Sequence, residues 1–227
     1  MRMQGTKVAA LAAVAAFALT ACATESHRTV EPRTAESRGT RYSGPRHPLA
    51  IGNFQNRSSY LSGVFSSGQD TLGSQAKTML ETHLGETGRF DLLDRGNLGE
   101  IAKEAQLAGV TSTLTAARYL VSGEVTEFGR KTTGDHQVFG IVGRGAEQTA
   151  YAKVSLNVVD VATSRVVYSV QGGGEYALSS REILGTGGSA GYDSTLNGKV
   201  LDLAITEAVD RLVRGLEGGE WTVTGAP

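Results

Sequence analysis

The sequence predicts its architecture most directly at residues 149–171, which read TAYAKVSLNVVDVATSRVVYSVQ. Apolar side chains at Val154, Leu156 and Val158 alternate with polar ones along the first part of this stretch. Such alternation indicates a β-strand with one buried face. Residues 162–164 then turn the chain into a second apolar run. The stretch therefore predicts an antiparallel β-hairpin.

Three helices are predicted outside this hairpin, because apolar residues recur there at helical spacing. They cover residues 70–84, 98–107 and 196–216. We expect Gly85 and Gly88 to end the first of them. The last helix is the longest and the most strongly amphipathic.

Short strands are predicted at residues 49–51, 90–94 and 119–125. Residues 53–56 are expected to form a turn. The predicted elements describe an α+β fold, with a mixed, mainly antiparallel sheet packed by about three helices. We expect this domain to span residues 49–220.

The N-terminus has the parts of a bacterial export signal, which we place at residues 1–21. Basic residues precede an apolar run of about twelve residues, which is too short for a transmembrane helix of about twenty. The signal ends in Leu19, Thr20 and Ala21, directly before Cys22. This ending is typical of bacterial lipoproteins, in which the cysteine takes a diacylglycerol and becomes the mature N-terminus.

Cys22 is the only cysteine of the chain, so it has no disulfide partner in an oxidising compartment. The alternative is a plain secretory signal followed by a chance cysteine. We expect Cys22 to carry a covalent diacylglycerol and acyl lipid such as palmitate, and we expect no other cofactor. By resemblance to other Gram-negative lipoproteins, Ala23 favours sorting to the outer membrane, with the domain facing the periplasm.

The segment after the signal, residues 22–48, combines charges of both signs with almost no apolar side chains. A segment of this composition cannot bury a core. We expect a lipidated, flexible tether that reaches roughly 25–30 Å from the membrane. At the other end of the chain, residues 221–227 are expected to form a short tail.

Composition argues against several classes of function. The net charge is −1, so no basic field would attract nucleic acid. The 4 histidines are scattered without the spacing of a metal site, and His83 is expected to lie exposed on its helix. Residues 187–191 match the G-x-S-x-G nucleophile motif, but no histidine follows His136 to serve as the base. We therefore expect a protein that is not an enzyme and that holds no metal.

Glycine supplies 30 of the 227 residues and is concentrated in two stretches, 129–148 and 172–193. Each has about the length of a hairpin whose two strands cross a bilayer in 9–11 residues, and an oligomer could close such hairpins into a barrel. The alternative is a pair of loops, because charged residues crowd both stretches. The apolar part of the first candidate membrane hairpin consists of Val138, Phe139, Gly140, Ile141 and Val142.

Five motifs follow one another along the chain. They are TGRFDLLDRGNL (87–98), ARYLVSGEV (117–125), FGI (139–141), VSLNVVDVAT (154–163) and AITEAV (204–209). In order and spacing they resemble the CsgG/HfaB family of curli-secretion lipoproteins, over nearly all of residues 49–216. The resemblance implies a lipid-anchored periplasmic α+β domain, which in curli secretion forms a ring that passes unfolded fibre subunits across the outer membrane.

The resemblance also assigns positions within the chain. The two glycine-rich stretches take the place of the membrane hairpins, and the loop at 58–68 takes the place of the pore constriction. Its candidate constriction residues are Gly63, Val64, Phe65, Ser66, Ser67 and Gly68. This loop lacks the tyrosine and the asparagine–phenylalanine pair of the curli channel, and the second glycine-rich stretch is shorter than in the family.

The function implied by the resemblance is assembly, export or anchoring of a surface polymer by an outer-membrane lipoprotein. Its expected partners are the outer membrane, through the lipid, and copies of itself or other envelope proteins. Secreted polymer subunits are a further expected partner, and nucleic acid is not. The alternative is a periplasmic adaptor without a pore, which binds an envelope or peptidoglycan-machinery partner.

Overall fold

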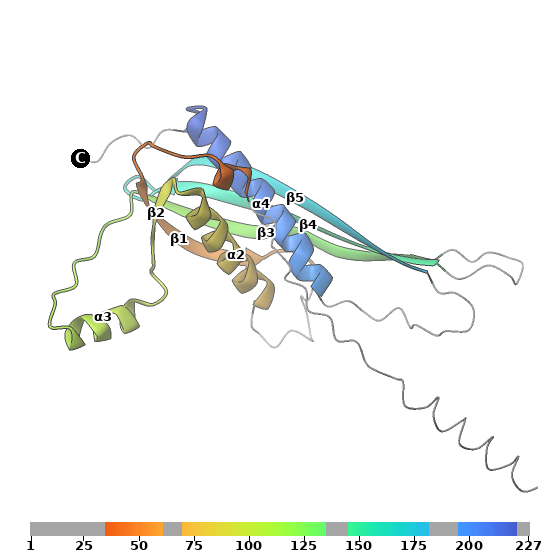
Figure 1. The fold of residues 1–227 in the computed structure, drawn as a ribbon, viewed down its shortest axis with the longest axis horizontal. Coiled ribbons are helices and arrows are strands. Elements are labelled where there is room, and N and C mark those ends of the chain that lie inside the picture. Colours follow the sequence, from red (N-terminus) through yellow and green to blue (C-terminus); the bar gives the residue numbers. More distant parts are fainter. Residues whose placement is uncertain (1–34, 61–69, 135–144, 182–194, 222–227) are drawn as a thin grey trace, which may run out of the picture. The chain divides into compact units, whose positions relative to one another are not determined.

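The computed structural model describes residues 35–60, 70–134, 145–181 and 195–221. Its elements follow one another in a fixed order (Figure 1). They are η1 (Glu36–Gly39), β1 (His47–Asn56), α2 (Thr71–Thr87), β2 (Phe90–Leu93), α3 (Leu98–Leu107), β3 (Tyr119–Gly134), β4 (Gly145–Asp160), β5 (Arg165–Arg181) and α4 (Thr195–Glu217). None of the helices in these described segments has the length and apolar character needed to cross a bilayer.

The strands form a 5-stranded sheet in the order β2-β1-β3-β4-β5. Strand β1 runs parallel to both of its neighbours, whereas β3, β4 and β5 pair in antiparallel fashion over almost their whole length. The predicted hairpin at residues 149–171 is confirmed as the middle of β4 and the start of β5. The α+β class and the mixed, mainly antiparallel sheet are also confirmed.

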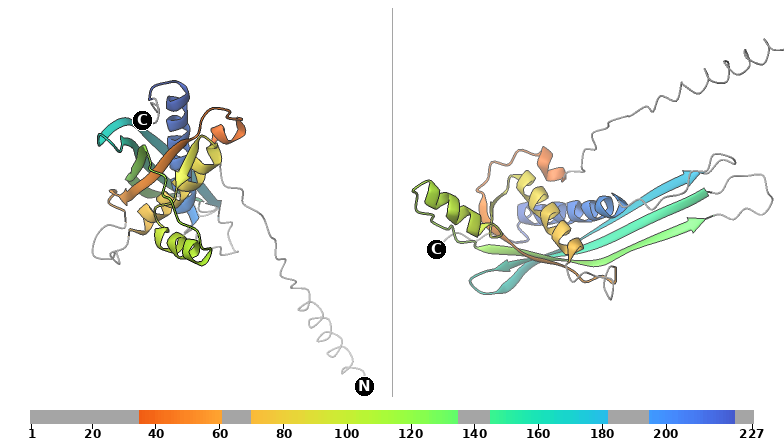
Figure 2. Two further views of the ribbon diagram at one scale, coloured as in Figure 1. Left: turned by 90° about the vertical axis from the view of Figure 1, so that its left-hand side faces the viewer. Right: turned by 90° about the horizontal axis from the view of Figure 1, so that it is seen from below.

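Helices α2 and α4 cover one face of the sheet, as Figure 2 shows, and the hydrophobic core lies between them and the strands. The inward residues of β3 and β4, such as Val121, Val125 and Leu156, are fully buried there. Burial of leucine and valine side chains of this kind contributes about 1.5–3 kcal/mol each. The core thus depends on the same alternation that predicts the hairpin.

Glycines of β5 allow α4 to approach the sheet closely. A Cβ atom on Gly174 would lie 2.7 Å from the carbonyl oxygen of Val200, and one on Gly172 would lie 2.5 Å from the backbone nitrogen of Ala208. No side chain fits at either position without moving the helix. These glycines therefore serve packing within a regular strand.

One local prediction is wrong, and another is confirmed for only one of its two glycines. Residues 53–56 continue β1, because Phe54 is buried and the strand resumes pairing with β3 after a bulge. Helix α2 passes through Gly85 and ends at Gly88, whose φ of 67° is the left-handed conformation that glycine adopts at a helix end.

Helix α3 is present at the predicted residues 98–107 but does not pack on the sheet. None of its residues is buried, and it contacts no other helix or strand of the described part of the chain. It projects from one end of the sheet (Figure 1). We call residues 94–118, which comprise α3 and its two connections, the α3 arm.

The predicted membrane stretches fall partly within the sheet. Strand β3 continues to Gly134 and pairs there with the start of β4 at Gly145, and β5 continues from Gly172 to Arg181 along β4. These parts of β3, β4 and β5 extend beyond β1, and their far ends extend beyond the first turn of α4 (Figure 2), whereas Gly172 and Gly174 lie against that helix. We call them the sheet extension.

Candidate functional site

The site residues predicted from the sequence lie outside the described residues. This holds for the lipid attachment site, for the candidate constriction loop and for the apolar part of the first hairpin. In order along the chain they are Leu19, Thr20, Ala21 and Cys22, then Gly63 to Gly68, then Val138 to Val142. Their assignments stay predictions, and the structure shows the residues that border them.

Asp70 ties the two sides of the constriction loop together. One of its carboxylate oxygens accepts a hydrogen bond of 2.7 Å from the backbone N–H of Asn56, at the end of β1. The other accepts one of 2.7 Å from the backbone N–H of Gly73. This aspartate is therefore the N-cap of α2, where its charge also favours the helix dipole.

A small polar and aromatic group joins this point to the sheet extension. The rings of Tyr60 and Phe128 lie 4.6 Å apart between their centroids. Asn197 Nδ2 donates a hydrogen bond of 3.0 Å to the Tyr60 hydroxyl, and Arg130 Nε donates one of 2.7 Å to Asn197 Oδ1. Tyr60 lies in the connection after β1, Phe128 and Arg130 on β3, and Asn197 in the first turn of α4. We call these four residues the loop-end cluster.

The loop-end cluster brings together residues that border the candidate constriction loop and the two glycine-rich stretches. Tyr60 directly precedes the segment that holds the candidate constriction residues, and Asn197 follows the second glycine-rich stretch. Phe128 and Arg130 lie on the strand that leads into the first stretch. Sequence reasoning missed this group, because its contacts join residues far apart in the chain.

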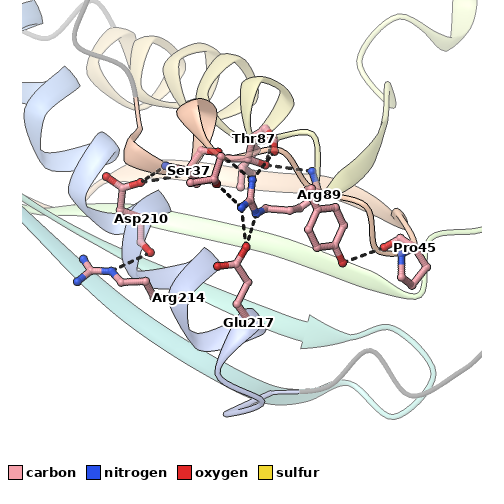
Figure 3. Close-up of polar contacts among 10 residues, drawn as sticks. Ser37, Pro45, Thr87, Arg89, Asp210, Arg214 and Glu217 are labelled. Carbon is pink, nitrogen blue, oxygen red and sulfur yellow. Dashed lines mark hydrogen bonds and ion pairs between the residues drawn. The ribbon is translucent and has the colours of Figure 1, made fainter.

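A buried arginine holds the N-terminal segment of the described chain (Figure 3). Arg89 is 2% exposed and directs its Nε and one Nη toward Glu217 Oε1, at 2.8 and 2.5 Å. The other Nη donates to the backbone oxygens of Ser37 and Thr87, at 2.8 and 2.7 Å. The Thr40 hydroxyl accepts a further bond of 2.7 Å. All five N–H donors of the guanidinium are used, which removes the cost of burying an unpaired charge.

Residues 35–42 are therefore part of the folded body, and we call them the docked segment. Ala35 is buried, and the Asp210 carboxylate on α4 accepts weak bonds from the backbone and hydroxyl of Ser37, at 3.4 and 3.5 Å. The Tyr42 ring lies over the Arg89 guanidinium, 5.1 Å from it. The composition of residues 22–48 did not predict this docking, which depends on partners on α2 and α4.

His83 is also buried, so the prediction that it lies exposed on its helix is wrong. The residue is 3% exposed and its Nε2 lies 2.8 Å from Asp202 Oδ1, where α2 packs against α4. The hydroxyl of Thr206 lies 3.4 Å from the same nitrogen. Among the residues that the structure describes, no group of three or more His, Cys, Asp and Glu side chains could hold a metal ion.

Hydrogen bonds lower the pKa values of two carboxylates at the end of the sheet that carries the α3 arm. The backbone N–H of Thr163 donates to Asp160 in the β4–β5 turn, and this bond, with help from Arg118, lowers the pKa of Asp160. The side-chain amide of Asn97 similarly lowers the pKa of Asp94 at the base of the α3 arm. Both carboxylates stabilise turns and are typical of structural roles.

The outer strands of the sheet extension have free edges. The last pairing of β3 with β1 joins Val125 to Asn56, and β3 then continues to Gly134. Within the described residues, no strand pairs with the β1-facing edge of β3 beyond this point or with the outer edge of β5. The extension therefore presents unpaired backbone groups on both sides.

The chain is similar to the following proteins of known sequence or structure. The chain is 56% identical over 219 residues to NMB1126/NMB1164, a candidate lipoprotein of Neisseria meningitidis serogroup B, covering 96% of this chain and 98% of that protein. The PelC dodecamer from Paraburkholderia phytofirmans is 16% identical, with a TM-score of 0.35, over 81% of this chain and 95% of that one. Lipoprotein GNA1162 from Neisseria meningitidis is 10% identical, with a TM-score of 0.37, over 74% of this chain and 99% of that one.

A family profile decides the assignment that the five sequence motifs suggested. The profile described as curli production assembly/transport component CsgG matches residues 37–224, from the docked segment past the end of α4. The matched region includes β1 to β5, the loop-end cluster and the Arg89 site. The chain therefore belongs to the CsgG family.

Proposed function

We propose that this protein is an outer-membrane lipoprotein, anchored through Cys22, whose copies join into a ring that acts in export or anchoring of a surface polymer. Family membership supports a role in assembly or transport, and the similarity to a candidate lipoprotein supports the lipid anchor. The ring would act without enzymatic chemistry, by binding and by passing or holding its cargo.

The free edges of the sheet extension carry this proposal. Unpaired N–H and C=O groups on a long edge strand are a template for pairing with another chain. The edge of β5 on one copy and the edge of β3 on the next are different surfaces, so their contact is head-to-tail. A head-to-tail contact generates a ring when its rotation closes.

A second candidate function is a periplasmic adaptor without a pore, and one observation favours it. On the face of the extension that α4 leaves uncovered, Lys153 Nζ donates a hydrogen bond of 2.9 Å to Glu127 Oε1, and Glu175 on β5 is exposed. Charges facing lipid cost about 2–4 kcal/mol each at mid-membrane. This face of the extension is thus suited to water rather than to lipid. Any crossing of the bilayer would involve residues farther from β1.

Size measurement of the lipidated full-length protein, extracted in detergent, tests self-assembly. We expect discrete oligomers, and we expect Ala177→Lys on the exposed edge of β5 to reduce them, because an edge lysine opposes strand pairing. Tyr151→Lys on the central strand β4 is the matched control, since it adds the same charge on the same sheet away from an edge. Monomers in the wild-type sample would rule out the ring.

Conductance across a planar bilayer separates the pore from the adaptor. Oligomers that conduct support export through the ring, and oligomers that do not conduct support the adaptor. The anchor is tested by Cys22→Ala, which should release the protein from outer-membrane fractions. Retention of this variant in the membrane would contradict the lipid anchor.

A further inference from the structure

The α3 arm presents an apolar surface that nothing in the described chain covers. Ile101, Leu107, Val110 and Leu114 are between 39% and 78% exposed. Exposed apolar clusters of this kind mark interaction sites more often than ordinary surface. The arm is also a built element, because Arg95 donates a hydrogen bond of 2.5 Å to the backbone oxygen of Thr115 and so ties its two connections together.

A second uncovered apolar patch lies on the turn between β4 and β5. Val161, Val166 and Val167 are between 40% and 58% exposed, with Arg165 among them. We call residues 161–167 the valine turn. Its position beside the root of the arm is fixed by a hydrogen bond of 3.0 Å from the Val161 N–H to the Arg118 carbonyl.

The two patches have complementary charges. Glu100 and Glu104 on α3 are exposed, and neither forms an ion pair within the described residues. Arg165 in the valine turn is exposed and has no ion-pair partner there either. Lys103 is the one basic residue of α3, so the helix is acidic overall. Contact between the arm and the turn would cover apolar surface on both sides and pair opposite charges.

Within one copy, α3 contacts no strand of the described chain, although Arg118 at the root of its arm is bonded to Val161. The α3 arm connects β2, at one edge of the sheet, with β3, whereas the valine turn opens β5 at the opposite edge. In a head-to-tail ring, the β5 edge of one copy faces the β2 and β3 side of the next. The arm of the next copy is then rooted on the side that faces the valine turn.

We infer that the α3 arm docks on the valine turn of a neighbouring copy, with Leu107 and Val110 against the valines and Glu104 toward Arg165. This inference rests on the proposed ring and adds a second contact to it. Each copy donates one arm and accepts another, so the contact repeats around the ring. The test distinguishes this contact from three alternatives, in which the arm docks on the valine turn of its own copy, binds another protein or stays in solvent.

Cross-linking between singly substituted copies tests the inference directly. Full-length Leu107→Cys and Val166→Cys proteins are co-expressed in one membrane, where acylation blocks Cys22, and treated with a short bismaleimide. We expect a covalent dimer from the mixture, and far less from either variant alone. Lys77→Cys replaces Val166→Cys in the control mixture, since Lys77 is partly exposed and lies on α2 rather than in the valine turn.

A charge exchange provides a second readout that does not depend on cross-linker reach. We expect Arg165→Glu to reduce the yield of dimer by about two- to fivefold, the range of an exposed ion pair. Adding Glu104→Arg to the partner should restore it. The absence of rescue would contradict the assigned orientation of the arm.

The size of the oligomers, measured without cross-linker in the same samples, separates two kinds of failure. Oligomers that give no mixed dimer would overturn the arm contact and leave the ring intact. The same holds if one chain carrying both Leu107→Cys and Val166→Cys links only within itself. Monomers would overturn the proposed function itself. A mixed dimer within intact oligomers supports both.

Discussion

The docked segment and the α3 arm are both short additions to the same sheet, but their environments are opposite. Residues 35–42 lie against α2 and α4, and Arg89 holds them through hydrogen bonds to the Ser37 carbonyl and the Thr40 hydroxyl. The α3 arm, residues 94–118, is held mainly by hydrogen bonds within itself and exposes large apolar side chains to solvent. The first is therefore integrated into the body, whereas the second is available for another molecule.

This difference shows that the polarity of a segment does not decide whether it packs against the rest of the fold. The docked segment is polar and charged, yet it packs because a buried guanidinium offers donors in a fixed geometry. The α3 arm is amphipathic and helical, yet no apolar partner covers it within the described chain. An amphipathic helix without a partner in its own fold is typical of an interface.

The largest expected difference between these regions concerns two arginines. Arg89→Ala should lower the free energy of unfolding by about 2–5 kcal/mol, because it leaves the backbone oxygens of Ser37 and Thr87 without donors inside the fold. Arg95→Ala in the arm should lower it by less than about 0.5 kcal/mol. Denaturant titrations of both variants measure the contrast, and equal losses would contradict it.

Limited proteolysis should distinguish the regions in the unmodified protein. Trypsin needs a locally unfolded backbone, and local opening costs little where tertiary contacts are few. We expect cleavage at Lys103 in the arm to be at least about tenfold faster than at Arg38 or Arg41 in the docked segment. Mass spectrometry of the first fragments gives the order. Earlier cleavage at Arg38 would mean that the docked segment opens more readily than the arm.

Acid titration gives the smallest effect. Asp160 lies in the body, and its pKa is lowered by the Thr163 N–H, so its charged form stabilises the fold above its unfolded pKa of about 3.9. That contribution is lost as the pH falls through the lower folded pKa. The difference in stability between the wild type and Asp160→Asn should therefore shrink below about pH 4.

Asp94→Asn is the matched variant in the arm. The pKa of Asp94 is also lowered, by Asn97, but the group stabilises only a local turn. We expect it to change fraying of α3, seen by amide exchange, and to leave the global unfolding midpoint unchanged at every pH. A shift of the midpoint similar to that of Asp160→Asn would show that the arm unfolds together with the body.

Much of the fold follows from local patterns. The alternation at 149–171 and the apolar spacing at 196–216 predicted elements that the structure contains, because each pattern requires one buried face. Of the two glycines expected to end α2, Gly88 does so with a positive φ, whereas Gly85 is tolerated within the helix. Phe54 was read as part of a turn, because its buried position depends on pairing with β3.

The site was harder to predict, since its residues meet only in three dimensions. The burial of Arg89 depends on Glu217 and on the docked segment, which are far from it in sequence. The loop-end cluster likewise joins the connection after β1 to β3 and α4 through Tyr60, Phe128 and Asn197. The family motif at 87–98 does include Arg89, but no local pattern distinguishes a buried arginine from an exposed one.

Electron cryomicroscopy of the lipidated protein in detergent or nanodiscs tests the central claim most directly. We predict a closed ring in which the free edge of β5 on each copy lies beside the β3 side of the next. Particles in which these edges face solvent, whether single copies or assemblies joined through other surfaces, would contradict it.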